Sequence, residues 1–243
     1  MYRLRILLVP LLAGYILYAI SHANWISSVE AIASLFALWG IDLFTLPFQG
    51  KLAYRYGLLP WAAWTYASSV ALTFSRLTRL QRAAEVAWIL QDLDRHEQAA
   101  FWLARYGDGA IERDPWYGAA LARYLARVQT KVSLAMDLAD AALQSANLAR
   151  AHYVRGLCYL NVQEFHSAIA SFENARKLAV ATTDSVLTGF CYLRMGEAWN
   201  RLGEREYAHD HLLRAEIMLS FLPQAMQQAR NLKAGDPGIG QNA

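Results

Sequence analysis

The chain has 243 residues, enough for one medium-sized domain with an additional segment, and its net charge of +3 is too small to indicate nucleic-acid binding. Hydrophobic residues make up 56% of it and charged residues only 18%, below the ~25% usual in soluble domains. This apolar excess predicts a membrane segment. Cys158 and Cys191 lie in apolar helical stretches, where small core residues are expected rather than a disulfide or a metal pair.

The first apolar stretch runs from Ile6 to Val29 and contains no Asp, Glu, Lys or Arg. Its 24 residues can cross a hydrocarbon core of ~30 Å at ~1.5 Å per residue. We therefore expect a transmembrane helix over about 6–21. A cleaved secretory signal, with Ser21-His22-Ala23 as its cleavage site, and a buried soluble helix are the alternatives.

A second apolar stretch, Val29–Phe48, carries a glutamate at its start and Asp42 within it. A carboxylate inside a bilayer costs ~2.5–3.5 kcal/mol, so we expect Asp42 to lie near an interface, to be protonated or to face a membrane partner. The linker between the two stretches has no Lys or Arg, whereas Lys51 and Arg55 follow the second stretch. The positive-inside rule then predicts that residues 1–50 form a hairpin anchor with both ends cytoplasmic. A single span would instead place the rest of the chain outside the cytoplasm.

A third uncharged run, Tyr56–Ser75, is long enough to span, but basic residues flank it on both sides and a span would strand one basic cluster outside. For residues 51–79 we expect a helix that lies at the membrane surface or packs on the helices that follow. The rings expected at headgroup level are Trp61, Trp64 and Tyr66. A true third span is the alternative.

The stretch Ala149–Thr182 predicts two helices joined by a turn. Small residues would let the two helix backbones approach closely, and larger side chains would fill the space beside that contact. The residues in these positions are Gly156 and Tyr159 on the first helix and Ala168, Phe172 and Ala175 on the second. The same mutual spacings return 40 residues later at Gly196, Trp199, Ala208, Leu212 and Ala215.

This spacing resembles the tetratricopeptide repeat (TPR), a helix–turn–helix of about 34 residues with the pattern Gly, aromatic, Ala, Phe, Ala. The chain departs from the family at Arg155, where Leu is usual, and at Val180, where Pro is usual. Two weaker copies precede the two good ones. One is Ala122, Leu125, Leu134, Leu138 and Ala141, and the other is Ala87, Leu90, Ala99 and Leu103, with Tyr106 at the fifth position.

A single hairpin cannot bury its apolar face, so two good repeats predict further helical neighbours. The expected fold is all-α, with an N-terminal transmembrane helical hairpin followed by a TPR-like α-solenoid of about four helix pairs over residues 80–222. An ordinary helical bundle is the alternative. Residues 223–243 end in a Gly-rich segment without periodicity, and we expect them to form a disordered tail.

No catalytic, metal-binding or phosphate-binding motif is found in the sequence, so we expect neither enzymatic activity nor a cofactor. The TPR resemblance implies instead a groove, lined by the first helices of successive repeats, that binds protein partners. The residues at groove positions are Trp88, Arg123, Arg127, Arg150, Tyr153, Leu157, Asn161, Leu193, Glu197, Asn200 and Arg201. Its four arginines would suit an acidic segment or a chain-terminal carboxylate.

The expected function is that of a membrane-anchored TPR scaffold that recruits or holds protein partners, among them integral-membrane subunits of the same complex. The layout resembles the inner-membrane TPR subunits of Pel-type exopolysaccharide synthesis complexes, which implies a bacterial inner-membrane location with a cytoplasmic TPR domain. One alternative is a periplasmic TPR assembly factor for a pilus, secretion or respiratory complex. Another is an enzyme or transporter component in which Asp42 acts inside the membrane.

Overall fold

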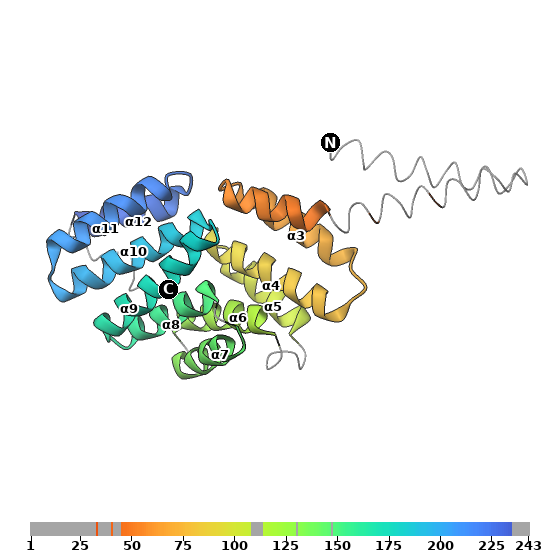
Figure 1. Ribbon diagram of the computed structural model, residues 1–243, viewed down its shortest axis with the longest axis horizontal. Helices are drawn as coiled ribbons and strands as arrows, with labels where there is room; N and C mark the ends of the chain where they lie inside the picture. The colour runs from red at the N-terminus through yellow and green to blue at the C-terminus, as the bar shows by residue number, and fades with distance from the viewer. Residues whose placement is uncertain are drawn as a thin grey trace, which may run out of the picture.

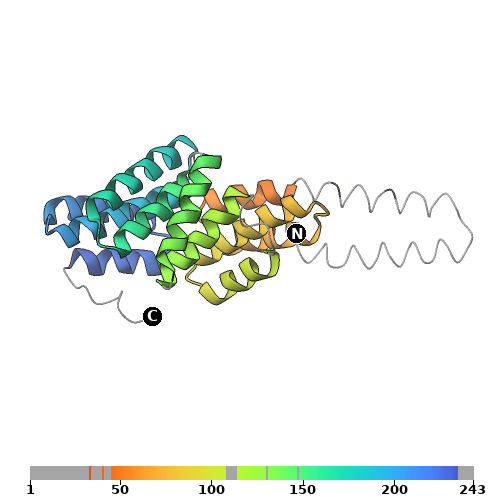
Figure 2. The same ribbon diagram turned by 90° about the horizontal axis from the view of Figure 1, so that it is seen from below.

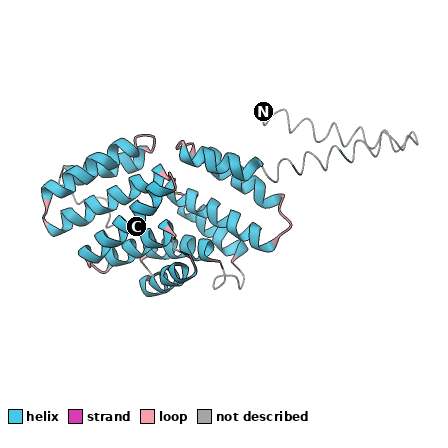
Figure 3. Ribbon diagram, in the orientation of Figure 1, coloured by secondary structure: helices cyan, strands magenta, loops and turns pink. Residues whose placement is uncertain are grey.

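The computed structural model describes residues 45–107, 114–129, 131–146 and 148–234, together with Ala33 and Gly40. The regular structure of this part of the chain is α-helical, as predicted (Figure 3). Residues 45–55 form a helix that leads into the others. These are α3 (Leu59–Ala71), α4 (Arg76–Asp92), α5 (His96–Tyr106), α6 (Pro115–Val128), α7 (Val132–Ser145), α8 (Ala149–Asn161), α9 (Phe165–Ala181), α10 (Ser185–Leu202), α11 (Arg205–Met218) and α12 (Pro223–Lys233).

The four predicted helix pairs are present as α4–α5, α6–α7, α8–α9 and α10–α11, stacked in chain order (Figure 1). In α8–α9 the TPR pattern acts as expected, because a methyl group on Gly156 would lie only 2.5 Å from the ring of Phe172. Phe172 is fully buried at this contact. In α10–α11 a methyl group on Gly196 would lie 2.6 Å from Leu212. The stack is therefore TPR-like in its close helix contacts as well as in its sequence pattern.

A fifth pair, absent from the sequence prediction, is formed by helix 45–55 and α3. Gly50 is the small residue of its first helix, since a methyl group there would lie 2.8 Å from the side chains of Thr65 and Tyr66. Ala62 and Ser69 are fully buried at the small positions of the second helix. The repeat stack thus includes residues that the sequence analysis assigned to the membrane anchor and to an interfacial helix.

Each pair turns at a residue with a left-handed backbone conformation. These residues are Gly57, Asp94, Gln129, Gln163 and Gly203, with φ values of 72°, 60°, 56°, 64° and 83°. Each follows the small residue of its first helix by the same interval, as 57 − 50, 163 − 156 and 203 − 196 show. At Gln163 the next amide, that of Glu164, donates to the Tyr159 carbonyl at 2.9 Å, which ends α8 in a Schellman-type turn. The equivalent hydrogen bond is present at the turns of Gly57, Asp94 and Gly203, although only two of the five left-handed residues are glycine.

Replacing Gln163 with glycine should raise the free energy of unfolding by about 0.5–1 kcal/mol, because glycine removes the Cβ strain of the left-handed conformation. Urea titration followed by far-UV circular dichroism measures the change. Gly203→Ala is the matched control, since it adds the same strain to the last pair and should lower stability by a similar amount. A Gln163→Gly variant no more stable than the parent would contradict this account of the turns.

The α6–α7 pair differs from the prediction in the register of its second helix. The residues expected to be buried were Leu134, Leu138 and Ala141, but the buried residues are Ala135, Ala139 and Ala142. Leu134 is 42% exposed. The cause lies in the turn, because α7 begins three residues after Gln129 (132 − 129), whereas α9 begins two residues after Gln163 (165 − 163). The additional residue moves every contact of α7 along by one position.

Most of the predicted membrane anchor, including Asp42, lies outside the described residues. Within the described ranges, no helix combines the length and the apolar character needed to cross a bilayer. A third span, the alternative for Tyr56–Ser75, is therefore not found, since α3 has 13 residues, or about 20 Å at ~1.5 Å per residue. This helix instead packs on α4, with Leu59 and Val70 buried and Trp61 45% exposed.

The C-terminal part of the stack also differs from the expectation of a disordered tail. Residues Pro223–Lys233 form α12, which packs on α11 and α10. Pro223 stands at the first helical position, where its missing N–H is tolerated, and Ala225 and Ala229 are buried one turn apart. An alanine stripe among polar residues is a weak periodic signal, yet it covers the end of the last pair.

The stack curls until its first pair touches its last (Figures 1 and 2). The Arg55 guanidinium donates to the Thr182 carbonyl at 3.1 Å, and the Ser185 hydroxyl donates to the Arg55 carbonyl at 3.1 Å. At Gly57 a methyl group would lie 2.6 Å from the ring of Phe221. The turn of the first pair therefore lies against the concave side of the stack, where the sequence analysis placed a groove.

Candidate functional site

The predicted groove residues of the central repeats converge, but inside the stack. The guanidinium carbon of Arg123, on α6, lies 4.4 Å from the ring of Trp88 on α4 and 5.4 Å from that of Tyr153 on α8. Arg150, one turn before Tyr153, has its guanidinium carbon 4.7 Å from the same Trp88 ring. We call this cluster of Trp88, Arg123, Arg150 and Tyr153 the centre. Together with Leu193 of α10, these residues are at most 9% exposed. The TPR pattern thus identified residues that meet in space, and they form a packed layer.

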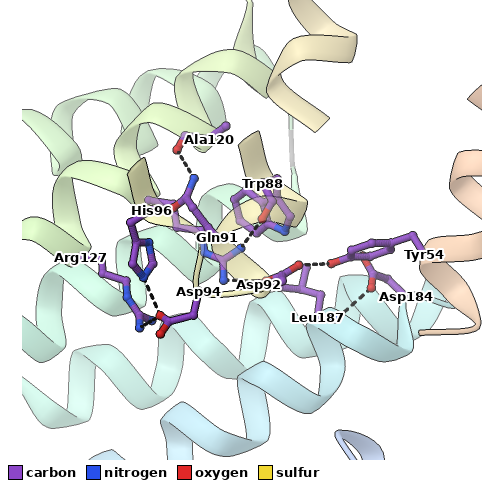
Figure 4. A network of polar contacts seen from close by, with 11 residues as sticks. Tyr54, Trp88, Gln91, Asp92, Asp94, His96, Ala120, Arg127, Asp184 and Leu187 are labelled. Atoms are coloured by element: carbon purple, nitrogen blue, oxygen red, sulfur yellow. Dashed lines mark hydrogen bonds and ion pairs between the residues drawn. The ribbon is translucent and has the colours of Figure 1, made fainter. Parts of the chain in front are cut away.

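Arg123 is neutralised at this centre by Asp92, at 2.7 Å, and the two side chains are only 4% and 1% exposed. The hydroxyl of Tyr54 donates to the second oxygen of Asp92 at 2.9 Å (Figure 4). Burial, the largest single effect, favours the neutral guanidine, but Asp92, Tyr153 and Tyr54 together outweigh it and hold the pKa of Arg123 above its ordinary value. Helix 45–55 therefore contributes directly to the centre through Tyr54.

Arg150 is held in the same way by Glu85. Its two terminal nitrogens donate to the two Glu85 oxygens at 2.8 Å and 2.9 Å, the bidentate geometry that suits a guanidinium and a carboxylate. The rings of Trp116 and Tyr54 lie 5.3 Å and 5.9 Å from its guanidinium carbon. Burial, the largest single effect, would lower the pKa of Arg150, but Glu85, Tyr54 and Asp184 together raise it above its ordinary value. The cation is thus both paired and enclosed by aromatic rings.

Arg123 and Arg150 therefore do not line an accessible basic groove, contrary to the expectation from the sequence. Their charges are paired with Asp92 and Glu85, and the side chain of Tyr54 covers the centre from the first repeat pair. Neither guanidinium can bind a partner's carboxylate without giving up its internal ion pair. In this structure they hold α4, α6 and α8 together.

Arg127 and Arg201 are the predicted groove residues that remain exposed. Arg127 pairs with Asp94 at 2.7 Å, with 40% and 45% of the two side chains exposed, and His96 contacts the same Asp94 oxygen at 2.6 Å (Figure 4). Arg127 and Arg201 occupy equivalent positions, each two residues before the left-handed residue of its turn (129 − 127 and 203 − 201). They form the accessible rim of the predicted groove.

The other predicted residues make contacts within the fold. Leu157 is partly buried against the core. The side-chain amides of Asn161 and Asn200 donate to the carbonyls of Ala126 and Leu232, at 2.6 Å and 2.7 Å. Glu197 pairs with Arg194 on its own helix at 2.6 Å. These polar groups are satisfied within the fold, so partner binding at them would compete with helix packing.

Asp184 is a second carboxylate near Tyr54 that the sequence analysis did not identify (Figure 4). It caps α10, accepting a hydrogen bond from the Leu187 amide at 2.9 Å. Burial is the largest effect on Asp184 and raises its pKa above the ordinary value. The nearby Arg150 lowers this pKa by a smaller amount. The ionised form of Asp184 is therefore the costly one in the folded protein.

Replacing Asp184 with asparagine should raise the free energy of unfolding at about pH 7, because asparagine keeps the capping oxygen and removes the partly buried charge. The folded-state pKa of Asp184 is raised, so ionisation costs stability as pH rises from the unfolded value of about 3.9 through the folded one. The gain over the parent should therefore disappear below about pH 4. Thermal unfolding across this pH range measures it, with Asp184→Ala, which loses the cap, as the less stable control. A gain that does not depend on pH would contradict the assignment.

Glu85, Asp92 and Tyr54 are the central residues that sequence reasoning missed. Glu85 and Asp92 flank Trp88 on one face of α4, three residues before it and four after it. Two acids on a first helix, opposite arginines on the next two first helices, are a signal that could have predicted ion pairs instead of a basic groove. Tyr54 offered no such signal, because it lies next to a segment interpreted as a membrane anchor.

A cleft of about 320 Å³ opens beside this centre, lined by Pro47, Tyr66, Thr78, Gln81, Arg82, Glu85 and Trp116. Two of its polar side chains are already engaged, since Glu85 pairs with Arg150 and Gln81 donates to Asp114 at 2.8 Å. Among the residues that the structure describes, no three His, Cys, Asp or Glu side chains are grouped so that they could hold a metal ion. The site therefore offers helix contacts and a charged rim.

No family model and no curated protein matches this chain. Among solved structures it is similar to MamA MSR-1 C2, with 16% identity over 74% of this chain and 98% of that one and a TM-score of 0.39. It is also similar to BtubC (BKLC) from P. vanneervenii, with 14% identity over 97% of this chain and 93% of that one and a TM-score of 0.43. Similarities this low assign neither a family nor a function. The helix pairs themselves define the class, an α-helical repeat protein of TPR type.

Proposed function

We propose that this protein is a membrane-tethered TPR-type scaffold, without enzymatic activity, that holds protein partners of an inner-membrane machine such as one for exopolysaccharide synthesis or export. The observation that carries the proposal is the position of helix 45–55. This helix belongs to the repeat stack, and residues 6–44 before it contain only two charged residues, Glu30 and Asp42. An apolar segment therefore leads into the stack without a polar linker.

The first pair is fixed to the rest of the stack by contacts that are far apart in the sequence. Tyr54 donates to Asp92, Arg55 donates to the Thr182 carbonyl, and Gly57 lies against Phe221. A tether built into the fold in this way would hold the stack in one orientation at the membrane. Tethering also raises the effective concentration of the stack beside membrane partners, so binding needs fewer contacts of its own.

Partners would meet the exposed rim, because the interior of the stack is closed by its own side chains. Arg127 and Arg201 lie there at equivalent positions of two repeats, and a guanidinium suits a carboxylate-bearing segment. The Arg127–Asp94 pair does not prevent this, since an exposed ion pair contributes only about 0–1 kcal/mol and can be exchanged for a partner's carboxylate.

Affinity purification of the full chain in mild detergent, with mass spectrometry of the co-purified proteins, tests the proposal. Replacing both Arg127 and Arg201 with alanine should remove the partners that the parent retains. The matched control is Lys177→Ala with Arg205→Ala, which removes two exposed cations from the second helices α9 and α11. Equal recovery of the partners with the rim variant and the parent would defeat the rim assignment.

The periplasmic assembly factor remains as a second candidate because of one observation. Helix 45–55 belongs to the repeat stack and Leu46 is 3% exposed, so a second span would be confined to the 14 residues between Glu30 and Thr45. At ~1.5 Å per residue these reach about 21 Å, less than the ~30 Å hydrocarbon core. A single span would place the stack in the periplasm. Protease digestion of inverted membrane vesicles separates the two candidates, because it degrades the stack only if that domain is cytoplasmic.

A further inference from the structure

The first repeat pair and the start of α4 form a basic region without acidic residues. Residues 43–84 contain five Lys or Arg and no Asp or Glu. Among the described residues, seventeen large hydrophobic side chains are exposed, and seven of them lie between Phe48 and Leu77. A surface that is both basic and apolar is typical of a protein that meets an anionic membrane.

Exposed apolar and basic side chains occur side by side at the corner between α3 and α4, which we call the α3–α4 corner and define as residues 72–77. Phe74 is 81% exposed and Leu77 is 55% exposed, and the side chain of Arg76, between them, is exposed as well. An aromatic ring, an aliphatic side chain and a guanidinium in one short segment match the chemistry of the membrane interface, where apolar and charged groups are both accommodated.

The backbone of the α3–α4 corner is held in place from both adjoining helices. Two nitrogens of Arg79 donate to the Thr73 carbonyl, at 3.0 Å and 2.6 Å. Arg82 donates to the Ser69 carbonyl at 2.9 Å, and Ser75 caps α4 by accepting from an amide of its first turn. Phe74 and Leu77 are therefore presented by a fixed corner, so their exposure is a property of the fold.

The α3–α4 corner lies at the end of the molecule where the apolar segment joins the stack. Pro47 of helix 45–55 and Thr78 of α4 line the same cleft, which places the start of that helix beside the first turn of α4. Figures 1 and 2 both show the start of helix 45–55 and the connection between α3 and α4 at one end of the stack. Phe48, near this end of helix 45–55, is 67% exposed.

We propose that the α3–α4 corner docks into the headgroup layer of an anionic phospholipid bilayer. The inference rests on the proposed tether, because the apolar segment is what holds this end of the stack against the membrane. Phe74 and Leu77 enter the boundary between headgroups and acyl chains, and Arg76 faces lipid phosphates. A lipid surface fits better than a protein partner because residues 43–84 contain exposed cations, Lys51 and Arg76 among them, and no carboxylate, which suits a continuous anionic layer.

The test places a nitroxide spin label on the full chain, reconstituted into vesicles of phosphatidylethanolamine and phosphatidylglycerol. The variants Phe74→Cys and Leu77→Cys supply the labelling sites, and Leu134→Cys on α7, 42% exposed and away from the corner, is the control (Figure 1). The native Cys158 and Cys191 are fully buried, and burial raises the pKa of Cys158 to about 12, so they do not compete for the label. Power saturation then compares collisions with oxygen, which concentrates in lipid, and with a water-soluble nickel chelate.

Labels at positions 74 and 77 are expected to show a several-fold higher ratio of oxygen to nickel collisions than the label at position 134. Flotation of the vesicles on a density gradient, run on the same samples, separates the possible failures. If the chain floats with the vesicles but all three labels report water, the docking inference is overturned and the tether stands. If the chain does not float, both the tether and the docking inference are overturned.

Discussion

Replacing Arg150 with methionine is expected to lower the free energy of unfolding by about 3–5 kcal/mol, because Glu85 would be left in the interior without its partner. The two side chains are 11% and 19% exposed and share two hydrogen bonds, at 2.8 Å and 2.9 Å. The Trp88 and Trp116 rings beside the guanidinium would also lose a cation. Urea titration followed by far-UV circular dichroism measures the loss.

Two controls show whether the loss comes from the uncompensated charge. The double variant Glu85→Gln with Arg150→Met should recover at least half of the stability lost in Arg150→Met, because it leaves no buried carboxylate unpaired. Arg155→Met, on the same helix, breaks an exposed pair with Asp140 at 3.4 Å, with 37% and 43% of the side chains exposed, and should cost less than about 1 kcal/mol. If Arg150→Met costs no more than Arg155→Met, the ion pair does not hold the stack.

This expectation changes how a binding experiment on the groove must be designed. A variant that replaces Arg127 and Arg150 together would lose its partners if Arg127 binds them, and it would lose them equally if the fold loosens around Glu85. The double variant Arg127→Ala with Arg201→Ala instead removes two exposed charges at equivalent repeat positions and leaves the interior intact. Loss of binding in that variant can therefore be read as loss of contact with the partner.

The helix pairs from α4 to α11 could be predicted from the sequence because their contact residues differ clearly from their surroundings. Gly156 against Phe172 and Gly196 against Leu212 each combine a missing side chain with a large one at a fixed spacing. That combination can be recognised in a single sequence, since few other arrangements of helices require it. The convergence of Trp88, Arg123 and Tyr153 followed from the same pattern.

The first pair could not be predicted in the same way. Its close contact is made by Gly50 against Thr65 and Tyr66, inside a region that is uncharged over long stretches and therefore has the composition of a membrane segment. Composition and packing compete as explanations here, and only the fold shows that Leu46 and Tyr54 are buried in the stack.

The closed interior was also beyond the sequence, because it depends on the accumulated curvature of five pairs. Small rotations between neighbouring pairs decide whether the first pair reaches Thr182 and Phe221 or leaves an open groove. The register of α7 depends on one additional residue in a turn whose left-handed residue, Gln129, is not glycine. Neither feature has a signature in hydrophobic periodicity.

Replacing Phe172 with alanine is expected to lower the free energy of unfolding by about 3–5 kcal/mol, the cost of removing a buried aromatic side chain and leaving a cavity. Phe172 is fully buried, and its ring lies against Gly156 and 5.6 Å from the ring of Tyr153. Gly156→Ala should cost about 1–3 kcal/mol by itself, because the new methyl group would lie 2.5 Å from the ring and force α8 and α9 apart.

The two losses should not add in the double variant, because the methyl group introduced by Gly156→Ala would enter the space that the ring leaves. We expect a coupling of about 0.5–3 kcal/mol in the favourable direction, measured by urea titration of the parent, the two single variants and the double variant. Gly156→Ala with Leu212→Ala is the control, since Leu212 packs on Gly196 in the next pair and its loss should add within about 0.5 kcal/mol. Additivity in both double variants would mean that the Gly156–Phe172 contact does not set the distance between α8 and α9, and the TPR-type geometry of this pair would have to be explained by other residues.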